Sequence, residues 1–234
     1  MKREEMPVVK VVIPAYNEAE AIGKVIQDIP SLVNEIVVID NASTDATAQV
    51  AKQAGATVLN EQKKGYGYAC LRGIDYLKTE GRSPEILVFL DGDYSDYPQE
   101  LIKLIDPIIA KKVDFALGAR TVKKRAKGSM TPQQIFGNAL ACFLMRKLYH
   151  GSFTDLGPFR AIRWDSLMKL NMQDKTYGWT IEMQLKILRH NISYVEIPVS
   201  YKQRIGISKV SGTIKGTIFA GMKIIGWIFK HYFS

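Results

Sequence analysis

Short apolar runs alternate with longer stretches of helical periodicity through the first half of the chain. The apolar runs are rich in β-branched residues and predict buried strands at residues 8–13, 35–39, 57–59, 86–90 and 113–117. The stretches between them predict helices within residues 22–29, 41–56, 63–81 and 98–111. This alternation is typical of βαβ units, and it predicts an α/β fold with a mostly parallel, doubly wound sheet and flanking helices.

The second half of the chain is less regular. We expect a helix at residues 133–149, a loop entering a strand at 155–163, a helix within 176–191 and a strand at 192–199. The last stretch, residues 213–233, is apolar but carries three lysines on one arc of a helical wheel: Lys215, Lys223 and Lys230. These charges argue against a membrane span.

Two interpretations of this last stretch stay open. It is either an amphipathic helix lying in a membrane interface, or a helix packed on the domain or on a second subunit. In both cases we expect one domain at residues 1–210, followed by an amphipathic helix at residues 211–234.

Composition narrows the class of partner. The 234 residues include 32 Lys and Arg against 23 Asp and Glu, and the formal net charge of +9 favours nucleotides, nucleic acid or acidic lipid headgroups. The two cysteines, Cys70 and Cys142, have no metal-binding spacing and predict reduced thiols in a cytosolic compartment. We expect no signal peptide, because the N-terminus has no apolar run of that length.

Polar residues directly follow three of the predicted strands. They are Asn17, Glu18, Asp40, Asp91 and Asp93. Since the carboxyl ends of parallel strands meet at one edge of a sheet, we expect a shared site there. Each residue alone is also a common turn or cap residue, and Asn17 with Glu20 has the spacing of a helix-capping pair.

The segment Asp91-Gly92-Asp93 carries the clearest chemistry. Two carboxylates one residue apart, on a turn tight enough to need glycine, suit a Mg²⁺ or Mn²⁺ ion that also holds a diphosphate. The alternative is an ordinary Asp-Gly turn.

Two basic loops are candidate anion-binding segments. Residues 121–129 lack periodicity and form either a solvated loop or a flap over an anionic ligand. Residues 200–209 place Arg204 and Lys209 on a glycine-bearing loop, where they either cradle a phosphate or are ordinary surface charges.

Six segments between Val8 and Lys209 together carry a family resemblance. In order, they read VVIPAYNE, VVIDNASTDAT, FLDGDYSDYPQE, GAR, DLGPFRAIR and RIGISK. In combination they resemble the family 2 glycosyltransferases of GT-A fold, in particular the branch that makes polyprenyl- or dolichyl-phosphate sugars. The resemblance implies a Rossmann-like sheet and an inverting, metal-dependent hexosyltransferase. It also implies a UDP- or GDP-linked sugar donor and a polyprenyl phosphate, dolichyl phosphate or other lipid-linked acceptor.

The resemblance further assigns roles to single residues. Those implied to bind the donor are Pro14, Ala15, Tyr16, Glu18, Asp40, Asp91, Gly92, Asp93, Arg120, Arg204, Ser208 and Lys209. Within this set, Asp91 and Asp93 match the metal-binding DxD motif, and Asp40 matches the residue that holds the base or ribose. Mg²⁺ and Mn²⁺ fit that motif equally well.

The catalytic role implied for the carboxylates depends on the acceptor. A hydroxyl acceptor needs a base, for which Asp155 is the first candidate and Glu182 the second. A lipid phosphate is already anionic, so Asp155 would then position groups. Arg204 and Lys209 complete the catalytic set by stabilising the leaving diphosphate. The chain departs from the branch at Ser95, which replaces a glutamine that helps to hold the metal.

Three alternatives compete with a glycosyltransferase that uses a lipid-linked acceptor. The first keeps the donor chemistry and uses a soluble sugar or small hydroxyl compound as acceptor. The second is a nucleotidyltransferase, although the segment PAYNEAEA lacks the glycine-rich loop expected there. The third is a nucleic-acid-binding module, which the acidic strand ends disfavour by repelling phosphate. We therefore expect a cytoplasmic enzyme on the inner face of the cytoplasmic membrane that binds no nucleic acid. The sequence does not predict the oligomeric state.

Overall fold

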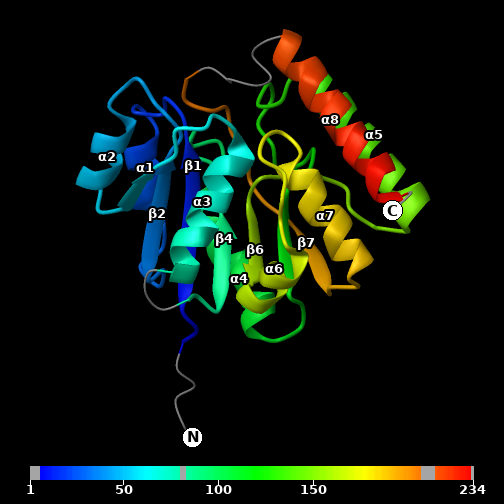
Figure 1. Ribbon diagram of the computed structural model, residues 1–234, viewed down its shortest axis with the longest axis horizontal. Coiled ribbons are helices and arrows are strands. Elements are labelled where there is room, and N and C mark those ends of the chain that lie inside the picture. The colour runs from blue at the N-terminus through cyan, green and yellow to red at the C-terminus, as the bar shows by residue number, and fades with distance from the viewer. Residues whose placement is uncertain (1–5, 80–82, 207–213, 233–234) are drawn as a thin grey trace, which may run out of the picture.

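A mixed seven-stranded sheet, in the order β3-β2-β1-β4-β6-β5-β7, forms the centre of the computed structural model (Figure 1). The structure describes residues 6–79, 83–206 and 214–232. The strands are β1 (Val9–Ala15), β2 (Glu35–Asp40), β3 (Thr57–Asn60), β4 (Ile86–Phe89), β5 (Phe115–Ala119), β6 (Arg160–Arg163) and β7 (Tyr194–Pro198). Among these residues only β6 runs antiparallel, and it lies between β4 and β5. The mostly parallel α/β sheet is confirmed.

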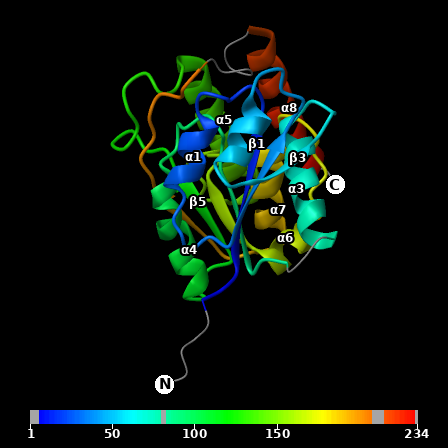
Figure 2. The ribbon, with the colours of Figure 1, turned by 90° about the vertical axis from the view of Figure 1, so that its left-hand side faces the viewer.

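Helices cover both faces of the sheet (Figure 2). One face carries α1 (Ile22–Asp28), α2 (Thr47–Gln53) and α4 (Leu101–Ile109), which follows a 3₁₀ turn at Pro98–Glu100. The other carries α3 (Tyr66–Thr79), α5 (Pro132–Tyr149), α6 (Trp164–Leu170), α7 (Trp179–Arg189) and α8 (Ile214–Tyr232). Because successive strand residues point to opposite faces, Val11 and Val12 of β1 belong to two different apolar cores.

The predicted end of the first strand is wrong. β1 does not stop at Pro14 but continues to Ala15. The carbonyl of Val12 accepts the N–H of Leu90 on the β4 side, and the pairing of β1 with β4 ends at Val12. The backbone of Pro14, two residues after Val12, faces the β4 side as well, but it lies beyond the last β1–β4 pair. Its missing N–H therefore removes no hydrogen bond from the sheet.

The predicted helix-capping pair at Asn17 and Glu20 is also wrong. α1 begins at Ile22, and its N-cap residue Ala21 makes no side-chain cap hydrogen bond. Asn17 instead lies in the left-handed region and accepts the backbone N–H of Thr44, joining the loop after β1 to the loop after β2. The residue that resembles a cap therefore shapes the edge of the sheet.

The C-terminal helix α8 packs on the domain, where it lies along α5 and α7 (Figure 1). Ile228 is fully buried, and its carbonyl accepts a hydrogen bond from the hydroxyl of Tyr149 on α5. No described helix is both long and apolar enough to cross a membrane. A helix is thus present at Ile214–Tyr232, whereas its amphipathic character stays a prediction. The predicted boundary at residue 210 falls outside the described residues and stays a prediction as well.

Candidate active site

A cavity of about 330 Å³ opens at the carboxyl ends of β1, β2 and β4. Eight of the predicted donor-site residues line it: Pro14, Ala15, Tyr16, Glu18, Asp91, Gly92, Asp93 and Arg204. They come from three separate parts of the chain, which the parallel sheet brings to one edge. The shared site expected at the strand ends is therefore present as a cavity.

The two carboxylates of the DxD segment lie in different surroundings. Asp91 Oδ1 accepts a hydrogen bond from the hydroxyl of Tyr66 at 3.0 Å. Asp93 Oδ1 accepts the backbone N–H of Ser95 at 2.9 Å and its hydroxyl at 2.6 Å. Burial and then the charge of Asp93 raise the pKa of Asp91 to about 6. Ser95, at the position of the family glutamine, thus orients one of the two carboxylates.

Arg204 connects the two sides of this cavity. Its Nη2 lies 2.6 Å from Glu18 Oε1, and its Nη1 lies 3.1 Å from Asp93 Oδ2. The segment before it is fixed by Lys202, whose N–H donates to the carbonyl of Ser95 at 2.9 Å. The guanidinium therefore sits beside the carboxylates, where it can turn to an anionic ligand. Ser208 and Lys209, predicted to act with it, lie outside the described residues.

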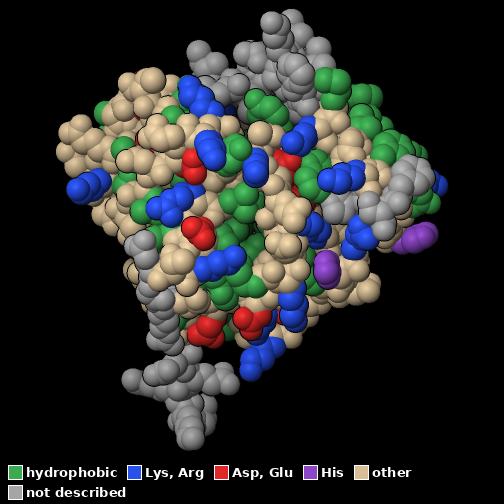
Figure 3. All heavy atoms as spheres, in the orientation of Figure 1, with side chains coloured by type: hydrophobic (Ala, Val, Ile, Leu, Met, Phe, Trp, Pro, Cys, Tyr) green, Lys and Arg blue, Asp and Glu red, His purple; other side chains and the backbone are tan. Residues whose placement is uncertain are grey.

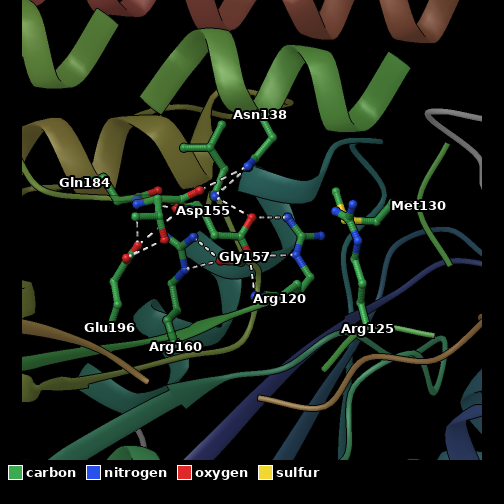
Figure 4. Close-up of polar contacts among 11 residues, drawn as sticks. Arg120, Arg125, Met130, Asn138, Asp155, Gly157, Arg160, Gln184 and Glu196 are labelled. Atoms are coloured by element: carbon green, nitrogen blue, oxygen red, sulfur yellow. Dashed lines mark hydrogen bonds and ion pairs between the residues drawn. The ribbon is translucent and has the colours of Figure 1, made fainter. Parts of the chain in front are cut away.

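Asp155 and Arg120 form a buried pair that does not line this cavity (Figure 4). Arg120 donates from Nε to Asp155 Oδ2 and from Nη2 to Oδ1, each at 2.8 Å, and its backbone N–H also reaches Oδ2. Burial favours the neutral acid, but the charge and hydrogen bonds of Arg120 outweigh it and hold the pKa of Asp155 below its usual range. An ionised carboxylate with its lone pairs filled is a poor proton acceptor.

Three elements hold the backbone around Asp155 in place (Figure 4). Asn138 of α5 accepts the N–H of Leu156 at 2.8 Å, Gln184 of α7 donates to the Asp155 carbonyl at 2.9 Å, and Glu196 of β7 accepts its N–H at 3.2 Å. The pair is therefore rigidly placed by contacts between distant parts of the sequence.

Two other predicted residues are not brought into the cavity. Glu182 is fully buried on α7, where its oxygens accept the N–H groups of Gln173 and Asp174, and Lys186 pairs with it at 2.7 Å. Asp40 is buried at the end of β2, and its Oδ1 has no hydrogen-bond partner in the described part of the chain. Asn41, the next residue, lines the cavity in its place.

The sequence interpretation missed six residues of the cavity wall. They are Asn41, Lys64, Gly65, Tyr66, Thr176 and Tyr177. The glycine-bearing turn KKGYG was a usable signal for three of them, since a turn before a helix in a βαβ unit lies at the same sheet edge. Lys64 Nζ lies 2.9 Å from the hydroxyl of Tyr16 and 4.7 Å from the centre of its ring. Thr176 and Tyr177 come from the second half, where no strand-end pattern marks them.

The carboxylate oxygens of this cavity fit a hard divalent cation bound together with a substrate diphosphate. Asp93 is buried and Asp91 is half-buried beside it, and the repulsion between these two carboxylates would be relieved by a cation. The described residues contain no group of three or more His, Cys, Asp or Glu side chains able to hold a metal. In proteins, Mg²⁺ is usually bound by one or two carboxylates together with phosphate oxygens of the substrate.

The Arg120–Asp155 pair lines a second cavity of about 270 Å³. Its polar lining includes both these residues and Arg125 from the basic loop. Met130 and Ile135 supply apolar surface. The loop at residues 121–129 therefore bounds a cavity that is both cationic and apolar.

Comparison with known proteins identifies the family. The sequence model of glycosyl transferase family 2 matches residues 10–170. An uncharacterized glycosyltransferase of Mycobacterium tuberculosis is 33% identical, with 91% of this chain and 94% of that protein covered. The polyprenol monophosphomannose synthase of Mycolicibacterium smegmatis is 29% identical, with 93% and 85% covered. The undecaprenyl-phosphate mannosyltransferase of Micrococcus luteus is 27% identical, with 88% of each chain covered.

Solved structures agree on the fold. The glucosyl-3-phosphoglycerate synthase from Mycobacterium tuberculosis, in complex with Mn²⁺, UDP and glucosyl-3-phosphoglycerate, matches with a TM-score of 0.74. The match covers 96% of this chain and 80% of that one at 20% identity, so it supports the GT-A fold alone. With the family match over most of the chain, these likenesses show that the protein belongs to glycosyl transferase family 2, as a hexosyltransferase resembling the polyprenyl-phosphate sugar synthase branch.

Proposed function

We propose that the protein is an inverting, metal-dependent glycosyltransferase that moves a hexose from a UDP- or GDP-linked donor to a polyprenyl or dolichyl phosphate. The observation that carries the proposal is the donor cavity, in which Asp91, Asp93 and Arg204 converge at the strand ends. A nucleoside diphosphate leaving group needs cationic stabilisation, and this cavity has the groups that supply it.

On the donor side, Asp91 and Asp93 would hold Mg²⁺ or Mn²⁺, which neutralises charge on the diphosphate. Arg204 would exchange its contact with Asp93 for a phosphate oxygen, so one guanidinium serves both the empty and the loaded site. Tyr16 and Lys64 at the mouth of the cavity offer a ring and a charge to the nucleotide.

On the acceptor side, the phosphate would lie against Arg120 and Arg125 in the second cavity, with the apolar chain along Met130 and Ile135. A phosphate oxygen attacks the anomeric carbon, the bond from that carbon to the diphosphate breaks, and the nucleoside diphosphate leaves with the electron pair. One displacement inverts the anomeric configuration. No proton moves, which agrees with the depressed pKa of Asp155.

A soluble hydroxyl acceptor is the weaker proposal, because it needs a base. Both candidates are already engaged: Asp155 by Arg120 and Glu182 by two backbone N–H groups and Lys186. In the proposed reaction with a lipid phosphate, Asp155 positions Arg120 and does not abstract a proton.

We further propose that the outer faces of α5 and α8 rest on the cytoplasmic face of a membrane that carries the acceptor. Phe136 and Phe143 on α5, and Met222 and Phe229 on α8, are exposed apolar side chains. Figure 3 shows hydrophobic side chains along the edge of the molecule that α8 forms. The sequences of both helices contain basic but no acidic residues, which suits an anionic lipid surface.

A thermal-shift screen tests the donor site. The protein is heated with UDP, GDP and CDP, each with Mn²⁺ or with a chelator. Binding only to the native state raises the melting temperature, so one nucleotide should shift it with Mn²⁺ and not with chelator. Asp93→Asn should abolish the shift, while Asp106→Asn, on an exposed part of α4, should keep it. No shift with any nucleotide would contradict the proposal.

A further inference from the structure

One wall of the donor cavity is an irregular loop that buried carboxylates hold in shape. Thr176 and Tyr177 line the cavity from the segment between α6 and α7. Glu182 of α7 accepts the N–H groups of Gln173 at 2.8 Å and Asp174 at 2.7 Å, which fixes the start of the loop.

Asp174 divides its two oxygens between this loop and the C-terminal helix. Its Oδ1 accepts the N–H of Thr176 at 2.7 Å and of Gly178 at 3.0 Å. Its Oδ2 accepts the indole N–H of Trp227 at 2.6 Å and lies 3.1 Å from the ammonium group of Lys223. The Asp174 side chain is fully buried, so water does not compete for these contacts.

The opposite side of the same loop lies against the start of α3. The N–H of Tyr68 donates to the Lys175 carbonyl at 3.0 Å. A Cβ at Gly67 would lie only 2.0 Å from the Asp174 carbonyl, so only glycine permits this approach. The residue before Gly67 is Tyr66, whose hydroxyl donates to Asp91. The loop is thus held between α8 and a segment that contacts the DxD carboxylates.

We infer that α8 positions the donor site: Trp227 and Lys223 fix Asp174, and Asp174 fixes the Thr176–Tyr177 wall and its packing on α3. This inference rests on the proposed nucleotide-sugar donor and adds a role for the helix that the donor chemistry does not require. Trp227 and Lys223 are positioning residues, since they act through Asp174 and do not line the donor cavity.

The exposed face of α8 is thereby linked to donor binding. Any contact that holds α8 on the domain, such as the proposed lipid surface, should tighten donor binding. By linkage, bound donor should then strengthen that contact by the same factor.

Calorimetric titration with UDP and with GDP, each with Mn²⁺, tests the inference in four full-length proteins. These are the wild type, Trp227→Phe, Asp174→Asn and the double variant. Trp227→Phe keeps an aromatic ring but removes the indole N–H together with part of the ring system. We expect each single variant to raise the nucleotide Kd roughly tenfold. The double variant should be no weaker than the weaker single variant, because both changes break one connection.

Steady-state kinetics and a matched control separate positioning from folding. The donor KM should rise in Trp227→Phe while kcat at saturating donor changes less. Gly221→Ala changes α8 at a position with no neighbour within 4 Å of an added Cβ, and its Kd should equal that of the wild type.

Two results overturn the inference alone: an unchanged Kd in variants whose melting temperature falls, or additive effects in the double variant. Failure of the wild type to bind either nucleotide would remove the proposed donor site and this inference together.

Discussion

The proposed donor side and the proposed acceptor side of the active site are built in different ways. The donor cavity uses the ends of β1, β2 and β4, which are parallel and joined by regular βα units. The proposed acceptor side uses the end of β5, the loop that enters the antiparallel strand β6, and side chains from α5, α7 and β7. Local sequence therefore determines most of the first, apart from Arg204 and the Thr176–Tyr177 wall, whereas contacts between distant segments determine the second.

This difference separates two kinds of carboxylate. Asp91 and Asp93 line a cavity, and burial together with the charge of Asp93 raises the pKa of Asp91, which suits a cation. Asp155 is saturated by Arg120 and backbone N–H groups, which suits a support. Carboxylates thus bind the proposed cation on the donor side and hold Arg120 in place on the acceptor side.

The largest expected effect is that of Asp93→Asn. The amide keeps the size of the side chain but removes the charge opposite Arg204 and the proposed cation, so we expect kcat/KM to fall roughly 10³-fold. Initial rates with the donor found in the thermal-shift screen measure it. The melting temperature without ligands should change little, and transfer at the wild-type rate would show that Asp93 does not act on the donor side.

Asp155→Asn should act mainly on stability. It leaves the Arg120 guanidinium buried without its partner, which costs about 3 kcal/mol of unfolding free energy. Urea denaturation measures this cost, and Asp106→Asn on the exposed face of α4 is the matched control. An unchanged midpoint would contradict the supporting role.

The pH dependence of stability sharpens the same prediction. The folded pKa of Asp155 lies below the unfolded value, so its contribution is present above the unfolded pKa and is lost as pH falls through the folded pKa. Between about pH 4 and pH 2, the wild type should therefore lose more stability than Asp155→Asn, and equal losses would contradict the cited shift.

Arg125→Gln should affect the acceptor alone. Arg125 lines the second cavity and not the donor cavity, so the acceptor KM should rise roughly tenfold while the donor KM stays unchanged. Rates measured while each substrate is varied separately give both constants. A rise in the donor KM would show that the two cavities act as one.

The smallest expected effect is that of Ser95→Ala. The change removes one hydroxyl hydrogen bond to Asp93 and leaves the carboxylate in place, so Mn²⁺-dependent nucleotide binding should weaken by about 1 kcal/mol, roughly fivefold. Titration with the nucleotide and Mn²⁺ measures it. An effect as large as that of Asp93→Asn would mean that Ser95 itself binds the cation.

The sequence predicted the donor side because its signals are local. Each strand is a short apolar run, and the polar residue directly after it falls at the ligand-binding edge, as Glu18 and Asp91 do. Thr176 and Tyr177 were not predictable in this way, since they reach the cavity through a loop shaped by Asp174 and Glu182.

The roles of single carboxylates also could not be predicted from the sequence. Asp155 was rightly placed in a loop that enters a strand, but its pairing with Arg120 depends on the antiparallel docking of β6 beside β5. The distinction between a base and a support comes only from that packing. For the same reason, the spacing of Asn17 and Glu20 suggested a helix cap that the fold does not form.

The proposed lipid-phosphate acceptor is tested most directly by a transfer assay that compares two acceptors differing only in the phosphate. The protein is incubated with Mn²⁺ and a labelled UDP- or GDP-linked hexose, together with either a polyprenyl phosphate or the matching polyprenol. We expect label in the lipid fraction only with the phosphate, no product with chelator, and a product of inverted anomeric configuration. Transfer to the polyprenol at a similar rate would contradict the proposal, because that reaction needs a base that this site does not provide.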